Sequence, residues 1–83
     1  MPAYNASKTI KKTHEEIIEQ GVVDLIIVVD DYSIDNTTLI AKNLIKTKVI
    51  SHKKNLGYGA NQKTCYKAAL DEGADIIIMV KPL

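Results

Sequence analysis

Apolar residues recur along the chain with helical spacing in three places, and this pattern predicts three helices. The first is an amphipathic helix whose inward positions lie at i, i+4, i+7 and i+8, namely Ile10, His14, Ile17 and Ile18. Asn5 or Ser7 can cap its start, and Gly21 is a plausible stop. The other two are expected from about residue 36 to 46 and from about residue 60 to 72, the latter ending at Gly73.

Short runs of apolar residues between these helices predict three strands. Leu25–Val29 and Ile76–Val80 are continuous and mostly β-branched, which is typical of strands buried on both faces. Residues 48–51 form a third, shorter strand. Because helices and strands alternate in the order α-β-α-β-α-β, the sequence predicts an α/β fold: a Rossmann-like parallel sheet with flanking helices and right-handed crossovers.

Length and composition restrict the possible classes of protein. Eighty-three residues make one domain at most. The net charge is +1 and there is no basic stripe, so nucleic acid is not an expected partner. The longest apolar runs have five residues, too few to cross a membrane. One cysteine and no recognisable signal peptide favour a cytoplasmic location.

The strongest chemical signal is the acidic pair Asp30 and Asp31, which directly follows the strand Leu25–Val29. Open parallel sheets bind ligands at the carboxyl ends of their strands, so this pair is a candidate for holding a polar ligand or a metal. The alternative is a solvated turn. Asp35, a few residues later, is better explained as a helix cap than as a ligand.

A second candidate is the glycine-bearing loop Asn55–Gly59, which opens the third helix. A helix start presents free N–H groups that can face phosphates. The pattern is neither a dinucleotide fingerprint nor a P-loop, because the third glycine is missing and Lys63 comes too late.

The two histidines and the cysteine are expected to be structural. His14 lies among isoleucines on a helix face, and His52 lies among lysines in what is expected to be a solvated loop. Cys65 lies among small residues within a helix, which favours inert packing over nucleophilic chemistry.

Four motifs, in order, resemble family 2 glycosyltransferases of the GT-A fold, most closely the dolichol-phosphate mannosyltransferase-like, polyprenyl-phosphate branch. They are Pro2-Ala3-Tyr4-Asn5, the stretch from Val28 to Thr37, Asn55-x-Gly57-x-Gly59-Ala60, and Gly73–Val80. The resemblance spans nearly the whole chain. It implies that residues 1–83 form a single partial domain, the truncated nucleotide-binding half of a GT-A enzyme.

The resemblance also implies a ligand and a set of contacts. The family uses a nucleotide-diphosphate sugar and a divalent metal, Mg²⁺ or Mn²⁺. By analogy, Pro2 and Tyr4 lie against the nucleotide, and Asp30 and Asp31 contact the base and ribose. Gly57, Gly59 and Lys63 shape the floor of the pocket.

Three departures from the family pattern bear on activity. Only Met1 remains of the family's first strand, and Ala6 and Ser7 stand where an acidic residue is often found. The run Ile76–Val80 should lead into an Asp-x-Asp that binds metal, but Lys81-Pro82-Leu83 follows instead. We therefore expect no catalytic residue and an incomplete metal site, so that the parent enzyme transfers a sugar to a lipid phosphate or other acceptor while this chain alone is inactive.

Two alternatives stay open at this point. The chain could be a non-catalytic α/β fragment, or a receiver-like phosphoacceptor domain, although no phosphorylatable Asp follows residues 48–51. If the chain is a truncated glycosyltransferase domain, active or not, its incomplete sheet leaves strand edges open. We therefore expect a homo-oligomer joined through these edges.

Overall fold

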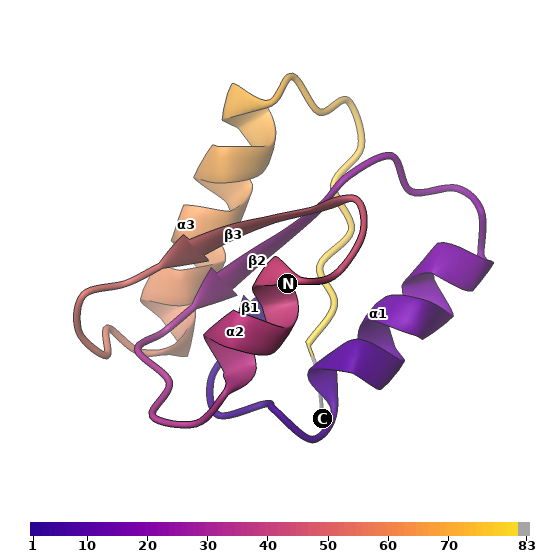
Figure 1. Ribbon diagram of the computed structural model, residues 1–83. Coiled ribbons are helices and arrows are strands. Elements are labelled where there is room, and N and C mark those ends of the chain that lie inside the picture. The colour runs from indigo at the N-terminus through magenta and orange to yellow at the C-terminus, as the bar shows by residue number, and fades with distance from the viewer. Residues whose placement is uncertain (82–83) are drawn as a thin grey trace.

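The computed structural model describes residues 1–81, which form a three-stranded parallel sheet covered by helices on both faces (Figure 1). The elements follow the order β1 (Pro2–Ala3), α1 (Ile10–Glu19), β2 (Ile26–Asp30), α2 (Thr37–Lys42), β3 (Thr47–Ser51) and α3 (Tyr58–Asp71). The predicted α/β class is confirmed. The chain starts with a short strand, however, so the observed order is β-α-β-α-β-α.

The central strand is β2, which pairs in parallel with β1 on one side and with β3 on the other. The register places Val29 opposite Pro2 and opposite Ile50. Val28 and Val29 are completely buried, as expected for a strand enclosed by helices on both faces. The predicted strand is therefore confirmed with its bounds shifted by one residue, since its pairing with β3 begins at Ile26 and ends at Asp30.

The main apolar core lies between β2 and the helices α1 and α2. Ile26 and Val28 of β2 meet Ile10 of α1 and Ala41 of α2 there. His14, 3% exposed, lies at the edge of this layer and bonds through Nε2 to the backbone oxygen of Ile45, at 2.8 Å. The prediction of a structural histidine is confirmed.

The helix ends differ from their predicted caps. Helix α1 begins after Thr9 with no side-chain cap, so neither Asn5 nor Ser7 caps it. Its end is as expected, since Gly21 has a φ of 69° and its N–H bonds to Ile18. Helix α2 is shorter than predicted and ends at Lys42.

The prediction of a strand at Ile76–Val80 is wrong, because these residues have no regular secondary structure. Ile76 and Ile78 are 84% and 66% exposed. An apolar run becomes a strand only where an edge offers backbone partners. On that side of the sheet β1 extends over two residues only, so it offers this segment few backbone partners.

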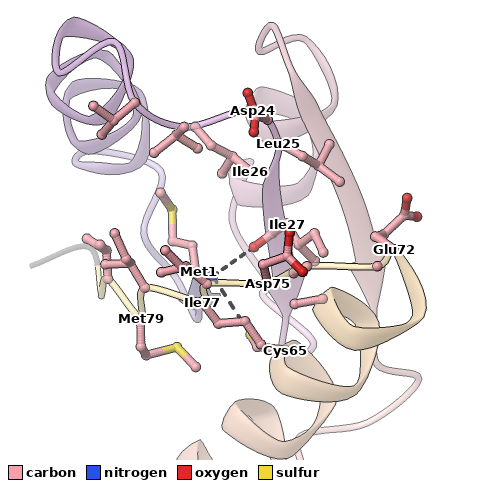
Figure 2. Close-up of a pocket in the computed structure, with 18 residues that line it drawn as sticks. Met1, Asp24, Leu25, Ile26, Ile27, Cys65, Glu72, Asp75, Ile77 and Met79 are labelled. Carbon is pink, nitrogen blue, oxygen red and sulfur yellow. Dashed lines mark hydrogen bonds between the residues drawn. The ribbon is translucent and has the colours of Figure 1, made fainter.

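A groove of about 590 Å³ separates this segment from the first half of β2 (Figure 2). Ile26 and Ile27 line one side, and Ile77 and Met79 line the other. At its inner end, the backbone nitrogen of Met1 bonds to the carbonyl of Ile27, at 2.7 Å. Strand β1 pairs with this edge of β2 only at Val29 and Asp30. Within residues 1–81, no strand pairs with the earlier part of the edge.

Thr37 joins the start of α2 to the loop after β1, and its replacement tests this link. It is completely buried; its hydroxyl accepts the Ala6 N–H at 2.8 Å and donates to Asp35. We expect Thr37→Val to lower the free energy of unfolding by about 1–3 kcal/mol, because a buried N–H loses its partner. Urea unfolding followed by circular dichroism measures this. Thr13→Val, which removes only a bond within α1, should change the stability by less than about 0.5 kcal/mol.

Candidate functional site

Strand β2 ends in two adjacent buried carboxylates that bind two different loops. Asp30 and Asp31 are 2% and 3% exposed. Successive side chains of a strand point in opposite directions, so neighbouring carboxylates can serve different parts of the molecule.

Asp30 organises the loop between β2 and α2. Its carboxylate accepts the Ser33 N–H at 3.0 Å, the Ser33 hydroxyl, and the Thr38 hydroxyl at 2.9 Å. These three bonds fix the turn that leads into α2. Asp30 is therefore satisfied by its own loop.

Asp31 organises the glycine loop between β3 and α3. One oxygen accepts the Leu56 N–H and the other accepts the Gly57 N–H, both at 2.9 Å. The first oxygen also bonds to Nδ1 of His52, at 2.9 Å. Gly57 has a φ of 91°, which favours glycine, and α3 begins at the next residue. One carboxylate thus holds both the loop and the start of the helix.

Two aspartates in the site have lowered pKa values. Burial raises the pKa of Asp31, but bonds from Leu56 N–H, His52 and Gly57 N–H outweigh burial and hold it below its usual 3.8. For Asp35 the desolvation effect is likewise outweighed by bonds from Thr37 and Ser7, which lower its pKa to about 2. Both groups are therefore ionised at neutral pH.

The loop after β1 is fastened to the loop after β2. The Asn5 N–H donates to the Ser33 hydroxyl at 2.8 Å, and the Asn5 side-chain oxygen accepts the Ile34 N–H at 3.0 Å. The Ser7 N–H donates to Asp35 at 3.2 Å. Asp35 also accepts the N–H of Thr37, the first residue of α2, but the N-cap position is occupied by Asn36, so Asp35 lies one residue before the cap that was predicted. Asn5 and Ser7 thus join two loops and do not cap a helix.

These loops surround a cavity of about 270 Å³ at the carboxyl ends of β1 and β2. It is lined by Pro2, Ala3, Tyr4, Asp31, Asn55, Gly57, Tyr58, Asn61 and Lys81. Helix α3 packs on the face of the sheet opposite α1 and α2 (Figure 1). Ligands of open α/β sheets bind outside the carboxyl ends of the strands, where this cavity lies.

Four of the predicted nucleotide-binding residues meet in this cavity, and three do not. Pro2, Tyr4, Asp31 and Gly57 line it. Asp30 is enclosed by its own loop, whereas Gly59 and Lys63 are exposed on α3 outside the lining. The roles given to all seven stay predictions.

The sequence reading missed several residues of the cavity wall. Asn61, 2% exposed, donates from its side chain to the backbone oxygen of Val29 at 2.8 Å and so fixes α3 against β2. Lys81 lies with its Nζ 4.9 Å from the centre of the Tyr58 ring, a cation–π contact. An amide at an inward helical position was the available signal for Asn61. No local pattern pointed to the meeting of Tyr58 and Lys81, which are 23 positions apart in the chain.

His52 was predicted to be a solvated loop residue, and this is wrong. Its side chain is 9% exposed and bonds to Asp31 and, through Nε2, to the Thr64 hydroxyl at 2.9 Å. The neighbouring lysines suggested solvent, and Lys53 and Lys54 are indeed exposed, but His52 directly continues β3. Cys65 is buried, and burial raises the pKa of its thiol, in agreement with inert packing.

The described residues do not form a metal site. Within residues 1–81 no three histidine, cysteine or acidic side chains are grouped so that they could bind one ion. The carboxylates of Asp30 and Asp31 already accept protein N–H and O–H groups. A hard divalent cation needs several free oxygen ligands, which these two side chains do not offer.

The fold and the cavity define a parallel α/β domain that presents a ligand site at the ends of its strands. Comparison with known proteins specifies the class: the model of glycosyl transferase family 2 matches residues 1–80, and the chain belongs to this family.

One curated relative is the UDP-N-acetylglucosamine–dolichyl-phosphate N-acetylglucosaminyltransferase of Methanococcus voltae. It is 35% identical over 94 aligned positions, which cover 94% of this chain and 37% of the relative. This chain therefore spans a little over a third of that protein's length. No solved structure matches the chain. No helix within residues 1–81 is long and apolar enough to cross a membrane.

The lowered pKa values of Asp31 and Asp35 predict the acid behaviour of the fold. A carboxyl group with a depressed folded-state pKa contributes stability above its unfolded value, near 3.8, and loses it as the pH falls through the folded value. We expect the melting temperature to be steady near neutral pH and to fall between pH 3.8 and about 2. Thermal scans from pH 6 to pH 2 measure this, and Asp35→Asn should make the fall shallower. An unchanged slope in that variant would contradict the assignment.

Proposed function

We propose that this chain forms the nucleotide-binding part of a glycosyltransferase and that the nucleotide of a nucleotide-diphosphate sugar binds in the cavity beside Asp31. The observation that carries the proposal is the meeting of Pro2, Tyr4, Asp31 and Gly57 around one cavity in a family 2 chain. Segments far apart in the sequence, from the starts of β1 and α3 and the end of β2, supply these residues.

The chemistry of the wall suits a nucleoside better than a sugar. Tyr4 and Tyr58 offer aromatic surfaces on which a base can stack, and Asn55 and Asn61 offer amide groups. At about 270 Å³ the cavity is slightly smaller than the roughly 300–1,000 Å³ typical of small-molecule sites. The nucleoside therefore fills it, and the diphosphate extends towards Lys81.

The parent enzyme is proposed to transfer its sugar to a lipid phosphate, in keeping with the dolichyl-phosphate acceptor named for the archaeal relative. Transfer requires compensation of charge on the departing diphosphate, and a base that accepts the acceptor's proton. Lys81 is a single cation, and no carboxylate within the described residues lines the cavity except Asp31, which is bonded to the loop. We propose that this chain by itself binds nucleotide weakly and transfers no sugar.

Nucleotide binding is testable by titration calorimetry with uridine and guanosine diphosphates, with and without Mn²⁺. We expect dissociation constants in the high micromolar range or weaker, roughly −4 to −6 kcal/mol, and little effect of metal. Asp31→Asn should abolish binding, because the loop that closes the cavity loses its anionic anchor. Tight, metal-dependent binding, or turnover of a nucleotide sugar, would contradict the proposal.

Lys81→Met gives a sharper test of where the phosphates lie. An exposed cation contributes up to about 1 kcal/mol to an ion pair, so the affinity for uridine diphosphate should fall by up to about fivefold while that for uridine stays the same. Lys67→Met, at an exposed position of α3 outside the cavity lining, is the matched control and should change neither affinity. A loss of uridine binding in Lys81→Met would place the base, rather than the phosphates, beside this residue.

We also propose that the chain self-associates along the open edge of its sheet. Ile76 and Ile78 are exposed, and on the β1 side Ile26–Val28 of β2 have no strand partner within the described residues. An apolar segment beside an unpaired strand edge favours pairing of that edge with a strand of a second copy.

Sedimentation velocity over a range of concentrations tests this association. We expect wild-type chains to form dimers or larger species as the concentration rises, and Ile78→Lys to stay monomeric because a charge interrupts the apolar segment. Ile34→Lys, at a position that is 84% exposed in another loop, should associate like the wild type. A wild-type monomer at high concentration would refute the proposal.

A further inference from the structure

We propose that His52 is a positioning residue of the nucleotide site: the bond from its Nδ1 orients the Asp31 carboxylate, which in turn holds the glycine loop in its ligand-ready shape. The nature of the ligand rests on the proposed function, but the geometric part of the inference does not.

The ring of His52 lies between the end of β2 and α3, two elements that are far apart in the sequence. Its backbone N–H donates to the Asp30 carbonyl at 2.8 Å, which extends the pairing of β3 with β2. Its Nδ1 lies 2.9 Å from Asp31, and its Nε2 lies 2.9 Å from the Thr64 hydroxyl of α3. The imidazole therefore spans from the end of β2 to the second turn of α3.

The partners of the ring determine where its protons lie. The Asp31 carboxylate is ionised and also accepts two backbone N–H groups, so Nδ1 of His52 must be a donor. Nε2 can then accept the proton of the Thr64 hydroxyl. If Nε2 is itself protonated, it donates to Thr64, whose hydroxyl donates in turn to the Ala60 carbonyl at 3.1 Å. Both ring nitrogens have a partner in either state.

The position of His52 excludes direct contact with a ligand in the cavity. Asp31 and Gly57 line the cavity, whereas His52 and Thr64 do not. His52 acts through Asp31, whose carboxylate is oriented by the ring and in turn holds Leu56 and Gly57. A residue that orients a first ligand-facing group in this way affects the shape of the site without touching its occupant.

Two amide substitutions separate the two ends of the ring. His52→Asn places a side-chain N–H where Nδ1 was and keeps the bond to Asp31, whereas His52→Gln reaches the position of Nε2 and keeps only the bond to Thr64. Thr64→Val removes the second bond and leaves the first. Three quantities are to be measured for each variant. They are the hydrogen exchange rates of the Leu56 and Gly57 amides relative to that of Val28 in β2, the melting temperature, and the affinity for uridine diphosphate.

We expect His52→Gln to speed exchange at Leu56 and Gly57 about tenfold and to weaken binding of uridine diphosphate by a similar factor, because a bond to a charged group is lost. His52→Asn and Thr64→Val should stay within about twofold of the wild type in both readouts. Exchange at Val28 should follow global stability alone, which separates positioning from general destabilisation.

Equal effects of Asn and Gln at position 52, or loop exchange that rises only in step with Val28, would overturn the inference. If the Gln variant does not fold, a tenfold rise of loop exchange in either His52→Asn or Thr64→Val overturns it equally, and slow exchange in both supports it. If the wild type binds no uridine diphosphate, the proposed function fails, while the exchange rates still decide the role of His52.

Discussion

The placement of two buried carboxyl groups at the end of β2 is the constraint on which the ligand-facing edge depends. Asp30 and Asp31 are buried, and a buried polar group is tolerated only when hydrogen bonds replace its lost water. Each obtains those bonds from a different loop, Asp30 from the turn into α2 and Asp31 from the turn into α3. The requirement to satisfy both groups therefore shapes both loops at once. The loop after β1 then joins this arrangement through Asn5 and Ser33.

Much of the architecture could be predicted from periodicity, because the dominant energetic term for helices and buried strands is the burial of apolar side chains. The run before Asp30 and the spacing of Ile10 and Ile18 report this burial directly. Strand status is less local. Ile76–Val80 has the composition of a strand but is separated from the open edge of β2 by a groove, whereas Pro2–Ala3, too short to show any period, becomes a strand because it pairs with β2.

The candidate site was predictable where a residue type reveals its chemistry and unpredictable where it depends on a meeting of distant segments. An acidic pair after a buried strand and a glycine loop before a helix are visible in the sequence, and the structure brings Asp31 and Gly57 together. The sequence does not show that the Asp31 carboxylate accepts hydrogen bonds from the glycine loop, or that the His52 side chain is turned towards Asp31. Those features depend on three-dimensional proximity, which no local pattern records.

The anchoring of the glycine loop by Asp31 has a kinetic consequence. Leu56 and Gly57 are already held by protein–protein bonds before any ligand arrives. A site of this kind needs no slow loop closure, so the encounter of a ligand with it is governed by diffusion and orientation. The affinity of such a site is then set by the lifetime of the complex, more than by its rate of formation.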